Sequence, residues 1–332
     1  MEYTRLSDIK LGDHIGGRVY ATFLCRDLEL RTKKNGIGQY MNLTIQDRHC
    51  IETGVKIFEL NDYTREMVKE GFVYEAAIDV QRYDMAKNGY SLSIYNISML
   101  AEDSKNYFDW CDGLADAASV VIDNINKIND ATYSRITSVI MSDNWESFVL
   151  FPAASSMHHS QLGGLCKHTC EVLTMALKIA QEIENSMGDI DLDYDLIRAA
   201  AILHDIGKVR EFSVDAATGK AVYAPEAALG THITTAVRMI DRVVFYMDTE
   251  EASYGSDDDT KVQLLEHCIL SHHGKKEYGS PIEPSIPEAY IVSKADTISA
   301  DMCRFGEAIS GLQSGESKTA WLSGKLEVYY KK

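Results

Sequence analysis

The sequence lacks any long apolar run. No stretch approaches the roughly 20 apolar residues that a membrane-spanning helix needs, so we expect no membrane partner. Residues 1–5 do not combine a basic segment with a following apolar one, so we also expect no secretory signal. Cys-x-x-Cys pairs are missing too, although the chain has seven cysteines. This argues against a disulfide framework and a four-cysteine zinc site, and the simplest expectation is a reducing cytoplasm.

Basic residues are scarce. The 33 lysines and arginines face 50 aspartates and glutamates, which gives a net charge of −17. A protein that coats nucleic acid usually carries a basic surface, so the total argues against that class. The deficit is uneven, because residues 1–100 hold 13 basic and 14 acidic side chains, whereas residues 101–332 hold 20 and 36. This step in charge predicts a boundary near residue 100 and more than one domain.

The N-terminal part alternates between apolar and polar residues in the manner of β-strands. We expect strands over residues 18–24, 40–45, 54–60, 72–83 and 90–100, with a short helix over 62–70. Five strands with a helix between the third and the fourth are the element order of an OB-fold barrel. We therefore predict an all-β OB-fold domain over residues 1–102, although many small β domains share these signals.

The rest of the chain has helical periodicity. Apolar residues recur at helical spacing between 105 and 150, and we assign residues 103–150 to a helical linker. Further helices are expected over residues 166–184, 195–206, 231–247, 260–271 and 286–313, which predicts an all-α bundle over residues 151–332. The very apolar helix at 195–206 should lie at its centre. The acidic stretch 248–260 is expected to be a solvated loop.

Eight of the ten histidines lie between residues 158 and 273. Imidazoles and carboxylates together suit divalent ions such as Mn, Fe, Zn or Ni, and helical bundles build metal sites from facing side chains. His204 and Asp205 end the apolar helix, where an uncompensated aspartate is costly and a metal ion is the natural compensation. The informative group comprises His168, His204, Asp205, His232, His272, His273 and Asp296.

This group resembles a known signature. His168, the His204-Asp205 pair and Asp296 are similar to the H…HD…D pattern of the HD-domain metal-dependent phosphohydrolases, and the other three histidines resemble the subgroup with two metals. Residues 151–154 and 158–169 resemble the entry to the HD domain of the YhaM-type 3′-to-5′ exoribonucleases, and residues 41–47 with 53–58 resemble their OB strands. That family carries an OB-fold followed by an HD domain, so the resemblance spans nearly the whole chain.

The resemblance implies a metal-dependent 3′-to-5′ exoribonuclease that hydrolyses phosphodiester bonds of single-stranded RNA, with single-stranded DNA left open. It implies one divalent ion on His168, His204, Asp205 and Asp296, and a second on His232, His272 and His273 with Asp205 bridging. Asp205 and Lys208 would be catalytic. Lys208 would bind a phosphate oxygen or protonate the leaving group, with a solvated helix-end lysine as the alternative. Manganese is the first expectation, with Fe, Ni, Zn or Mg as alternatives.

The OB domain would hold single-stranded RNA, because such domains combine basic groups with aromatic side chains that stack on bases. Its candidates are Arg18, Arg31, Lys33, Lys34, Tyr40 and Tyr83, and the tyrosines are also compatible with core or cross-strand pairs. His158 and His159 would touch the nucleotide, with structural roles as the alternative. Since the N-terminal part is nearly neutral, we expect modest RNA binding that depends on divalent cations.

Three alternatives stay open. One is an HD phosphohydrolase of small nucleotides with a regulatory OB domain. Another is a nucleic-acid-binding protein with a vestigial site, against which the complete ligand set argues. The third, a cyclic-di-GMP phosphodiesterase, would need a Gly-Tyr-Pro motif that residues 278–281 match only loosely. A homo-oligomer is compatible with the sequence.

Overall fold

The computed structural model describes residues 3–10, 14–83, 86, 89–154, 159–250, 255–312 and 317–318. The chain divides into two compact units, one of residues 1–109 with 214–219 and one of residues 110–213 with 220–332. These units differ from the predicted division. Residues 103–109 group with the first unit, and residues 110–150 belong to the second unit instead of forming a separate linker.

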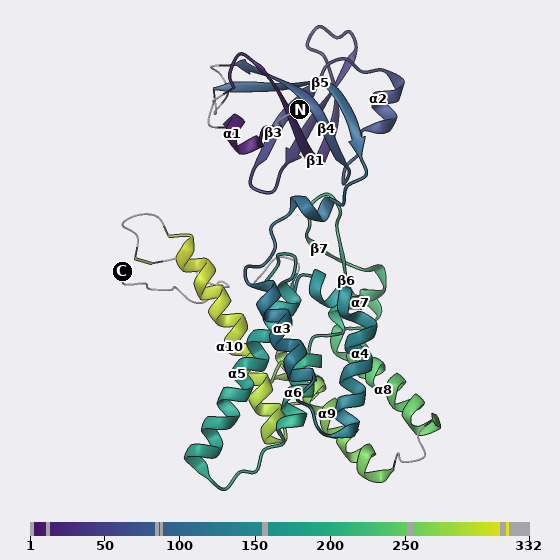
Figure 1. The fold of residues 1–332 in the computed structure, drawn as a ribbon, viewed down its shortest axis with the longest axis vertical. Coiled ribbons are helices and arrows are strands. Elements are labelled where there is room, and N and C mark those ends of the chain that lie inside the picture. The colour runs from purple at the N-terminus through teal and green to yellow at the C-terminus, as the bar shows by residue number, and fades with distance from the viewer. Residues whose placement is uncertain are drawn as a thin grey trace. The chain divides into compact units, whose positions relative to one another are not determined.

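The first unit is a closed barrel with the strand order β1-β2-β3-β5-β4 (Figure 1). Its elements are α1 (Leu6–Lys10), β1 (Arg18–Thr32), β2 (Gln39–Gln46), β3 (Ile51–Ile57), α2 (Asp62–Met67), β4 (Val73–Arg82), β5 (Tyr90–Leu100) and the 3₁₀ turn η1 (Ser104–Tyr107). Five strands with a helix between the third and the fourth confirm the OB-like class that the sequence predicts.

Strand β1 closes the barrel because it pairs with two neighbours. Residues 18–24 run antiparallel to β4, and residues 24–32 run antiparallel to β2. The register shifts between Cys25 and Asp27, where the strand changes partner. Such a bulge bends a strand and increases its twist, so one long strand can serve both sides of a small barrel. Leu6 and Ile9 of α1 are fully buried in the barrel core.

The second unit is helical apart from a two-stranded ribbon. Its elements are α3 (Leu114–Ile125), α4 (Ala131–Leu150), α5 (Gly164–Met187), α6 (Tyr194–Leu203), α7 (Lys208–Glu211), β6 (Phe212–Val214), β7 (Ala221–Tyr223), η2 (Pro225–Leu229), α8 (His232–Glu250), α9 (Ser256–Ser271), η3 (Lys276–Tyr278) and α10 (Pro287–Ser310). The predicted all-α bundle is confirmed.

Helix α6 lies in the core of this bundle. Its residues 199–203 are all fully buried, as expected for a helix that is apolar on every side. Residues of α3 and α4 pack in the same core as α5, α6, α8, α9 and α10. The two helices expected in a linker are therefore part of the bundle, because their apolar stripes are buried in its core.

The prediction of a solvated loop over residues 248–260 is wrong for most of that stretch. Residues 248–250 continue α8, residues 256–260 begin α9, and residues 251–254 lie outside the described part of the chain. The Asp258 carboxylate accepts hydrogen bonds from the Thr132 hydroxyl and from the Gly255 backbone N–H. Acidic residues stabilise the N-terminus of a helix, so this run of aspartates begins a helix instead of preventing one.

Candidate metal centre

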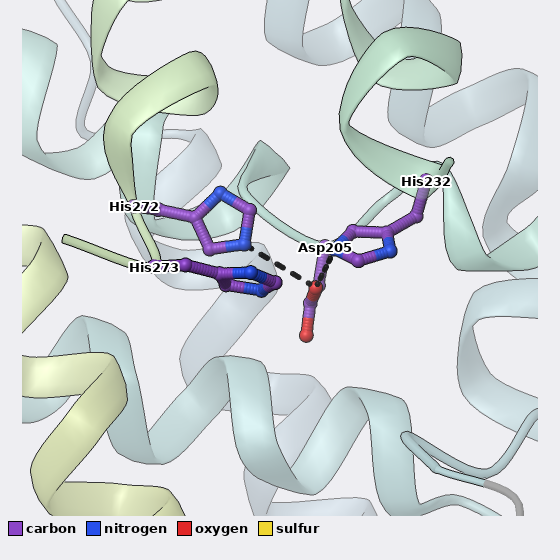
Figure 2. A group of neighbouring side chains, drawn as sticks. All are labelled: Asp205, His232, His272 and His273. Atoms are coloured by element: carbon purple, nitrogen blue, oxygen red, sulfur yellow. Dashed lines mark ion pairs between the residues drawn. The ribbon is translucent and has the colours of Figure 1, made fainter. Parts of the chain in front are cut away.

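The structure brings all seven predicted ligands together. They come from α5, from the residues that follow α6 and α9, from the first turn of α8, and from α10. One group holds Asp205, His232, His272 and His273 (Figure 2), and the other holds His168, His204 and Asp296. Within each group, one donor atom per residue lies within 4.8 Å of all the others. Residues up to 128 positions apart thus form one compact cluster.

Asp205 lies between the two groups. Its Oδ2 atom is 3.5 Å from His168 Nε2 and 3.4 Å from His204 Nε2. Its Oδ1 atom is 3.5 Å from His232 Nε2 and 3.8 Å from His272 Nε2, on the side that Figure 2 shows. The carboxylate therefore presents one oxygen to each group, which is the arrangement that a bridging ligand needs.

The Nδ1 atoms of all five histidines are held by protein groups. The partners are Ser299 Oγ for His168 (3.0 Å), the Ala201 carbonyl for His204 (2.8 Å), Glu211 Oε2 for His232 (2.9 Å), the Ile269 carbonyl for His272 (2.7 Å) and the Tyr278 carbonyl for His273 (3.0 Å). Four of these partners are carbonyl or carboxylate oxygens, which only accept hydrogen bonds, so in those four rings Nδ1 carries the proton and Nε2 keeps its lone pair. The rings are thereby prepared to bind a cation through Nε2.

Three buried atoms of the centre have no hydrogen-bond partner among the described residues: Asp205 Oδ1, His232 Nε2 and His272 Nε2. Such atoms cost about 1–3 kcal/mol each when left unpaired. Ligands at about 2.0–2.2 Å from one ion lie about 3.0–3.5 Å from one another, close to most of the separations above. The residues therefore fit a divalent cation, which would satisfy all three atoms.

Burial keeps several of the histidines neutral. Burial is the main cause that lowers the pKa of His273. It also lowers the pKa of His272 well below its usual value, and the neighbouring imidazoles act in the same direction. Burial also lowers the pKa of His168, against the opposing effect of Asp296. For His204, burial acts in the same direction, but the Asp205 carboxylate outweighs it and raises the pKa. Neutral imidazole is the form that binds metals.

The two carboxylates of the centre are ionised. Burial alone would raise the pKa of Asp205, but Lys208 and His204 hold it well below its usual value. Burial opposes ionisation of Asp296 as well, and the neighbouring His168 lowers its pKa despite that. His168 Nε2 lies 3.1 Å from Asp296 Oδ1. The centre thus holds two negative charges in a buried place, which favours a bound cation.

A close backbone contact fixes His232 beside Asp205. A Cβ atom on Gly207 would lie 1.9 Å from the His232 carbonyl oxygen, so only glycine fits at this position. The turn that follows Asp205 therefore packs directly on the first residue of α8. This explains how a histidine 27 positions further along the chain comes to face the same carboxylate.

The centre opens into a pocket of about 550 Å³. Its walls include the side chains of Lys208, Tyr278 and Arg304 in addition to the ligands. Lys208 Nζ lies 2.6 Å from Asp205 Oδ2, and Arg304 Nη1 lies 3.2 Å from Asp301 Oδ1. A pocket that combines ionised ligands with an ammonium and a guanidinium suits a phosphate ester.

The structure describes one of the two histidines of the entry segment. His158 lies outside the described residues. His159 does not line the pocket at the metal centre; its Nε2 atom lies 3.2 Å from Glu171 Oε2, behind His168. Its predicted contact with the nucleotide stays a prediction.

The barrel candidates do not all lie at one place. Arg18 is paired with Asp79 at 2.5 Å, and its guanidinium stacks 4.5 Å above the Tyr95 ring. Lys33 and Lys34 follow β1 in the turn to β2, and Tyr40 lies in β2 next to Phe58, with the ring centres 5.5 Å apart.

The remaining barrel candidates differ in their surroundings. Arg31 Nη2 lies 2.6 Å from Glu29. Tyr83 lines a hollow of about 580 Å³ together with Lys56 and Tyr90. Arg31, Lys33, Lys34 and Tyr40 therefore lie near one another, whereas Arg18 pairs with β4 and Tyr83 follows β4. The contact of all six candidates with RNA stays a prediction.

Sequence reasoning missed four residues around the centre: Glu171, Glu211, Ser299 and Arg304. Glu171 follows His168 by three positions and Ser299 follows Asp296 by three positions, so each pair shares a helix face. That spacing could have indicated both residues once the ligands were known. Glu211 and Arg304 carry no signal that separates them from solvated charges.

The comparisons with known proteins agree with this geometry. The HD domain family model matches residues 165–301. The 3′-5′ exoribonuclease YhaM of Bacillus subtilis (strain 168) is 31% identical over 282 residues, which cover 83% of this chain and 83% of that protein. The protein of the same name from Bacillus pumilus (strain SAFR-032) is 27% identical over the same length, with the same coverage.

A further relative aligns over a shorter stretch. The 3′-5′ exoribonuclease YhaM of Bacillus licheniformis is 33% identical over 192 residues, which cover 58% of this chain and 56% of that protein. In the part of the chain that the structure describes, none of the helices has the length and apolarity needed to cross a membrane.

Proposed function

Because the chain belongs to the YhaM family of 3′-5′ exoribonucleases, we propose that it is a metal-dependent hydrolase that removes nucleotides from the 3′ end of single-stranded RNA. The observation that carries this proposal is the cluster of five histidines and two carboxylates, of which His168, His232, His273 and both carboxylates line one pocket. The mixture of an ionised ligand cluster with cationic pocket walls supports a phosphodiester substrate.

Two divalent ions fit the two ligand groups. His168, His204 and Asp296 would hold one, and His232, His272 and His273 would hold the other, with one Asp205 oxygen facing each group. A donor set of imidazoles and carboxylates favours Mn, Fe, Ni or Zn over Mg, and we propose Mn. When bound, such ions polarise the phosphoryl group and lower the pKa of the attacking water.

Lys208 is placed to act on the substrate. Its ammonium lines the pocket and pairs with Asp205 Oδ2 at 2.6 Å, so it partly neutralises the ionised centre. From this position it can bind a phosphate oxygen or donate a proton to the departing 3′ oxygen. Both roles use a positive charge at the place where negative charge develops during hydrolysis.

Arg304 and Tyr278 are the substrate contacts that the pocket adds. Asp296, Ala300 and Arg304 follow one another at four-residue spacing and therefore share one face of α10. The small side chain of Ala300 leaves space between the ligand and the guanidinium, which suits a neighbouring phosphate of the RNA. The Tyr278 side chain is 64% exposed and offers a ring on which a base can stack.

The barrel supplies further RNA contacts in this proposal. Lys33, Lys34 and Tyr40 lie on or near the turn between β1 and β2, and Tyr83 lies on a separate hollow with Lys56. Arg18 is already paired with Asp79. Because so few basic side chains are available, they support weak binding of single-stranded RNA instead of tight electrostatic binding.

A reducing compartment fits the cysteines. All seven lie in the described part of the chain and none of them forms a disulfide there; five are buried. Disulfides are rare in the cytoplasm, where thiols stay reduced. We therefore place the enzyme in the cytoplasm.

A 5′-labelled single-stranded RNA tests the proposed function. With Mn²⁺ the protein should shorten the labelled strand stepwise from its 3′ end and release mononucleotides. Single-stranded DNA of the same sequence tests the breadth of the substrate. Hydrolysis of free nucleotides without any shortening of the RNA would instead indicate a small-nucleotide phosphohydrolase.

A double variant separates hydrolysis from binding. His204→Ala with Asp205→Ala should abolish hydrolysis and leave RNA binding in place, because neither residue belongs to the barrel. Loss of RNA binding with retained hydrolysis would contradict this assignment.

A further inference from the structure

A chain of side-chain hydrogen bonds lies behind His168, on the side away from its Nε2 atom. His168 Nδ1 lies 3.0 Å from Ser299 Oγ, and the Ser299 hydroxyl donates to Glu171 Oε2 at 2.8 Å. His159 Nε2 lies 3.2 Å from the same Glu171 oxygen. Four side chains thus form a relay that begins at a ligand and ends outside the ligand cluster.

The chemistry of the relay fixes the direction of its bonds. A carboxylate only accepts hydrogen bonds, so Ser299 must give its single proton to Glu171. The Ser299 oxygen is then left to accept a proton from His168 Nδ1. The lone pair of His168 therefore resides on Nε2, which lies 3.1 Å from Asp296 Oδ1 and 3.3 Å from His204 Nε2.

Two helices each supply one ligand and one relay residue. Helix α5 carries His168 and Glu171, and α10 carries Asp296 and Ser299, in both cases three positions apart. Residues at this spacing share a helix face. The bond between Ser299 and Glu171 therefore also sets how the faces that carry His168 and Asp296 meet.

The segment before α5 is strained in a way that serves the relay. His159 has φ of +55°, which a non-glycine residue adopts at a cost of order 1 kcal/mol. A Cβ atom on Gly164 would lie 1.9 Å from the His159 carbonyl oxygen, so the segment packs against glycine there. The His159 side chain is only 9% exposed beside Glu171. Such strain persists only where the surroundings hold the residue in place.

His168 differs from the other four ligand histidines in this respect. Three of them donate to backbone carbonyls, and His232 contacts the Glu211 carboxylate directly. For His168 alone the support runs through a serine hydroxyl that a substitution can remove without changing a ligand. The relay residues Ser299 and Glu171 line a second hollow of about 500 Å³ with Met175 and Met302, apart from the residues that line the pocket.

We propose that Ser299 and Glu171 are positioning residues, which hold His168 so that Nε2 binds a divalent ion together with His204 and Asp296. The proposal deepens the proposed metal-dependent function and rests on it. Support of this kind typically changes metal affinity by about 10–100-fold. His159, which the sequence assigned to the nucleotide, is the outer member of the relay.

Metal binding in the full-length protein is the direct test. Mn²⁺ is titrated against a chromophoric chelator for the unaltered protein and for Ser299→Ala. The alanine variant should bind one of two Mn²⁺ equivalents about 10–100-fold more weakly. Ser299→Thr, which keeps the hydroxyl, should restore most of that affinity. Glu171→Gln should cause a smaller loss, because an amide accepts a weaker hydrogen bond than a carboxylate does.

Ser293→Ala is the matched control. Ser293 is buried on the same helix, and its hydroxyl has no partner among the described residues, so the substitution removes the same atom without touching His168. Its Mn²⁺ affinity should equal that of the unaltered protein. If Ser299→Ala fails to fold, Glu171→Gln, which keeps the size of the side chain, decides the question in its place.

Kinetics give a second readout. At limiting Mn²⁺ the Ser299→Ala variant should lose activity, and excess Mn²⁺ should restore kcat with an unchanged KM for RNA. Equal Mn²⁺ affinity of Ser299→Ala and Ser293→Ala would overturn the relay and leave the proposed function intact. An unaltered protein that binds none of Mn²⁺, Fe²⁺, Ni²⁺ and Zn²⁺ would overturn the metal-dependent function itself.

Discussion

At the scale of single residues, Asp205 contributes to both ligand groups. Its two oxygens face different pairs of imidazoles, and its Oδ1 atom has no hydrogen-bond partner among the described residues. Lys208 and His204 keep it ionised although it is buried. A change at this position therefore alters both candidate ion positions at once.

Asp205→Asn should lower kcat/KM on RNA by at least about 10³-fold, which corresponds to about 4 kcal/mol of transition-state stabilisation. The asparagine side chain has the size and shape of aspartate, but its amide replaces the two charged carboxylate oxygens by one neutral oxygen and an NH₂ group. Both Mn²⁺ equivalents should bind more weakly in a chelator competition. Asp123→Asn, an exposed change on α3, is the control and should behave like the unaltered protein. Retained tight binding of two equivalents by Asp205→Asn would contradict the bridging role.

Glu266 gives the bundle a pH-dependent stability. Burial and the neighbouring Asp241 raise its pKa from 4.5 to about 7. In the unfolded chain the carboxyl ionises near its ordinary value, so between about pH 4.5 and pH 7 the folded state retains a proton that the unfolded state releases. Stability linked to this group is therefore complete below about pH 4.5 and is lost as the pH rises through 7.

The Glu266→Gln variant should consequently have the same unfolding free energy as the unaltered protein near pH 4.5. At pH 8 its unfolding free energy should be higher than that of the unaltered protein. We expect a difference of about 1–2 kcal/mol, reduced from the full shift because the group is only partly buried. Urea unfolding of the metal-free protein across this pH range measures it. Glu182→Gln, an exposed change on α5, should show no such trend. Parallel stability curves for the Glu266 variant and the unaltered protein would refute the assignment.

At the scale of elements, hydrophobic periodicity predicted where most helices and strands lie. The expected helices at 166–184, 195–206 and 231–247 correspond to α5, α6 and α8, because each has a continuous apolar stripe or is apolar throughout. The prediction of a loop over residues 248–260 is wrong because acidic side chains do not by themselves indicate a solvated loop. Its aspartates instead cap α9, and Asp258 bonds to Thr132 of α4, a contact that one sequence cannot reveal.

A substitution at Gly207 tests how tightly the turn after Asp205 packs against the start of α8. Gly207→Ala places a methyl group 1.9 Å from the His232 carbonyl oxygen, so the start of α8 must shift. We expect a loss of about 1–3 kcal/mol in unfolding free energy, as for other overpacked positions. One Mn²⁺ equivalent should also bind more weakly, because His232 moves away from Asp205. Urea unfolding and the chelator competition measure the two effects.

Gly306→Ala is the matched control for this change. Gly306 lies in α10 with nothing within 4 Å of the added methyl group, so the variant should gain about 0.5–1 kcal/mol. A Gly207→Ala protein as stable as the unaltered one, with unchanged Mn²⁺ binding, would show that α8 is held in some other way.

At the scale of the whole molecule, the sequence predicted the ligand types better than their surroundings. The unusual concentration of histidines and the His204-Asp205 pair were visible in the chain, and the structure brings all seven predicted ligands together. The hydrogen bonds that hold each Nδ1 atom come from Ser299, Glu211 and backbone carbonyls. Such contacts depend on tertiary packing, and a serine or a carbonyl has no distinguishing sequence signal. Residue type alone likewise does not reveal that Arg31 and Tyr40 are cross-strand partners, whereas Arg18 pairs with β4.

The distribution of charge leads to a prediction about RNA affinity. The first 100 residues are nearly neutral, and Arg18 and Arg31 already pair with Asp79 and Glu29. Lys33 and Lys34 are then the main basic groups of the candidate surface. Each phosphate neutralised on a single strand contributes about −0.7 to the slope of log K against log salt concentration. We therefore expect a shallow slope of about −1.5 for RNA binding.

Replacing Lys33 and Lys34 together by glutamine should bring that slope close to zero and raise KM for RNA several-fold. The kcat on bis(p-nitrophenyl) phosphate should not change, because neither lysine belongs to the metal centre. Lys127→Gln, in the turn that follows α3, should alter neither quantity. Fluorescence anisotropy of a labelled RNA over a range of KCl concentrations gives the slope. A slope steeper than about −4 in the unaltered protein would require about six or more phosphate contacts, and the barrel would then bind RNA through a basic surface much larger than these two lysines.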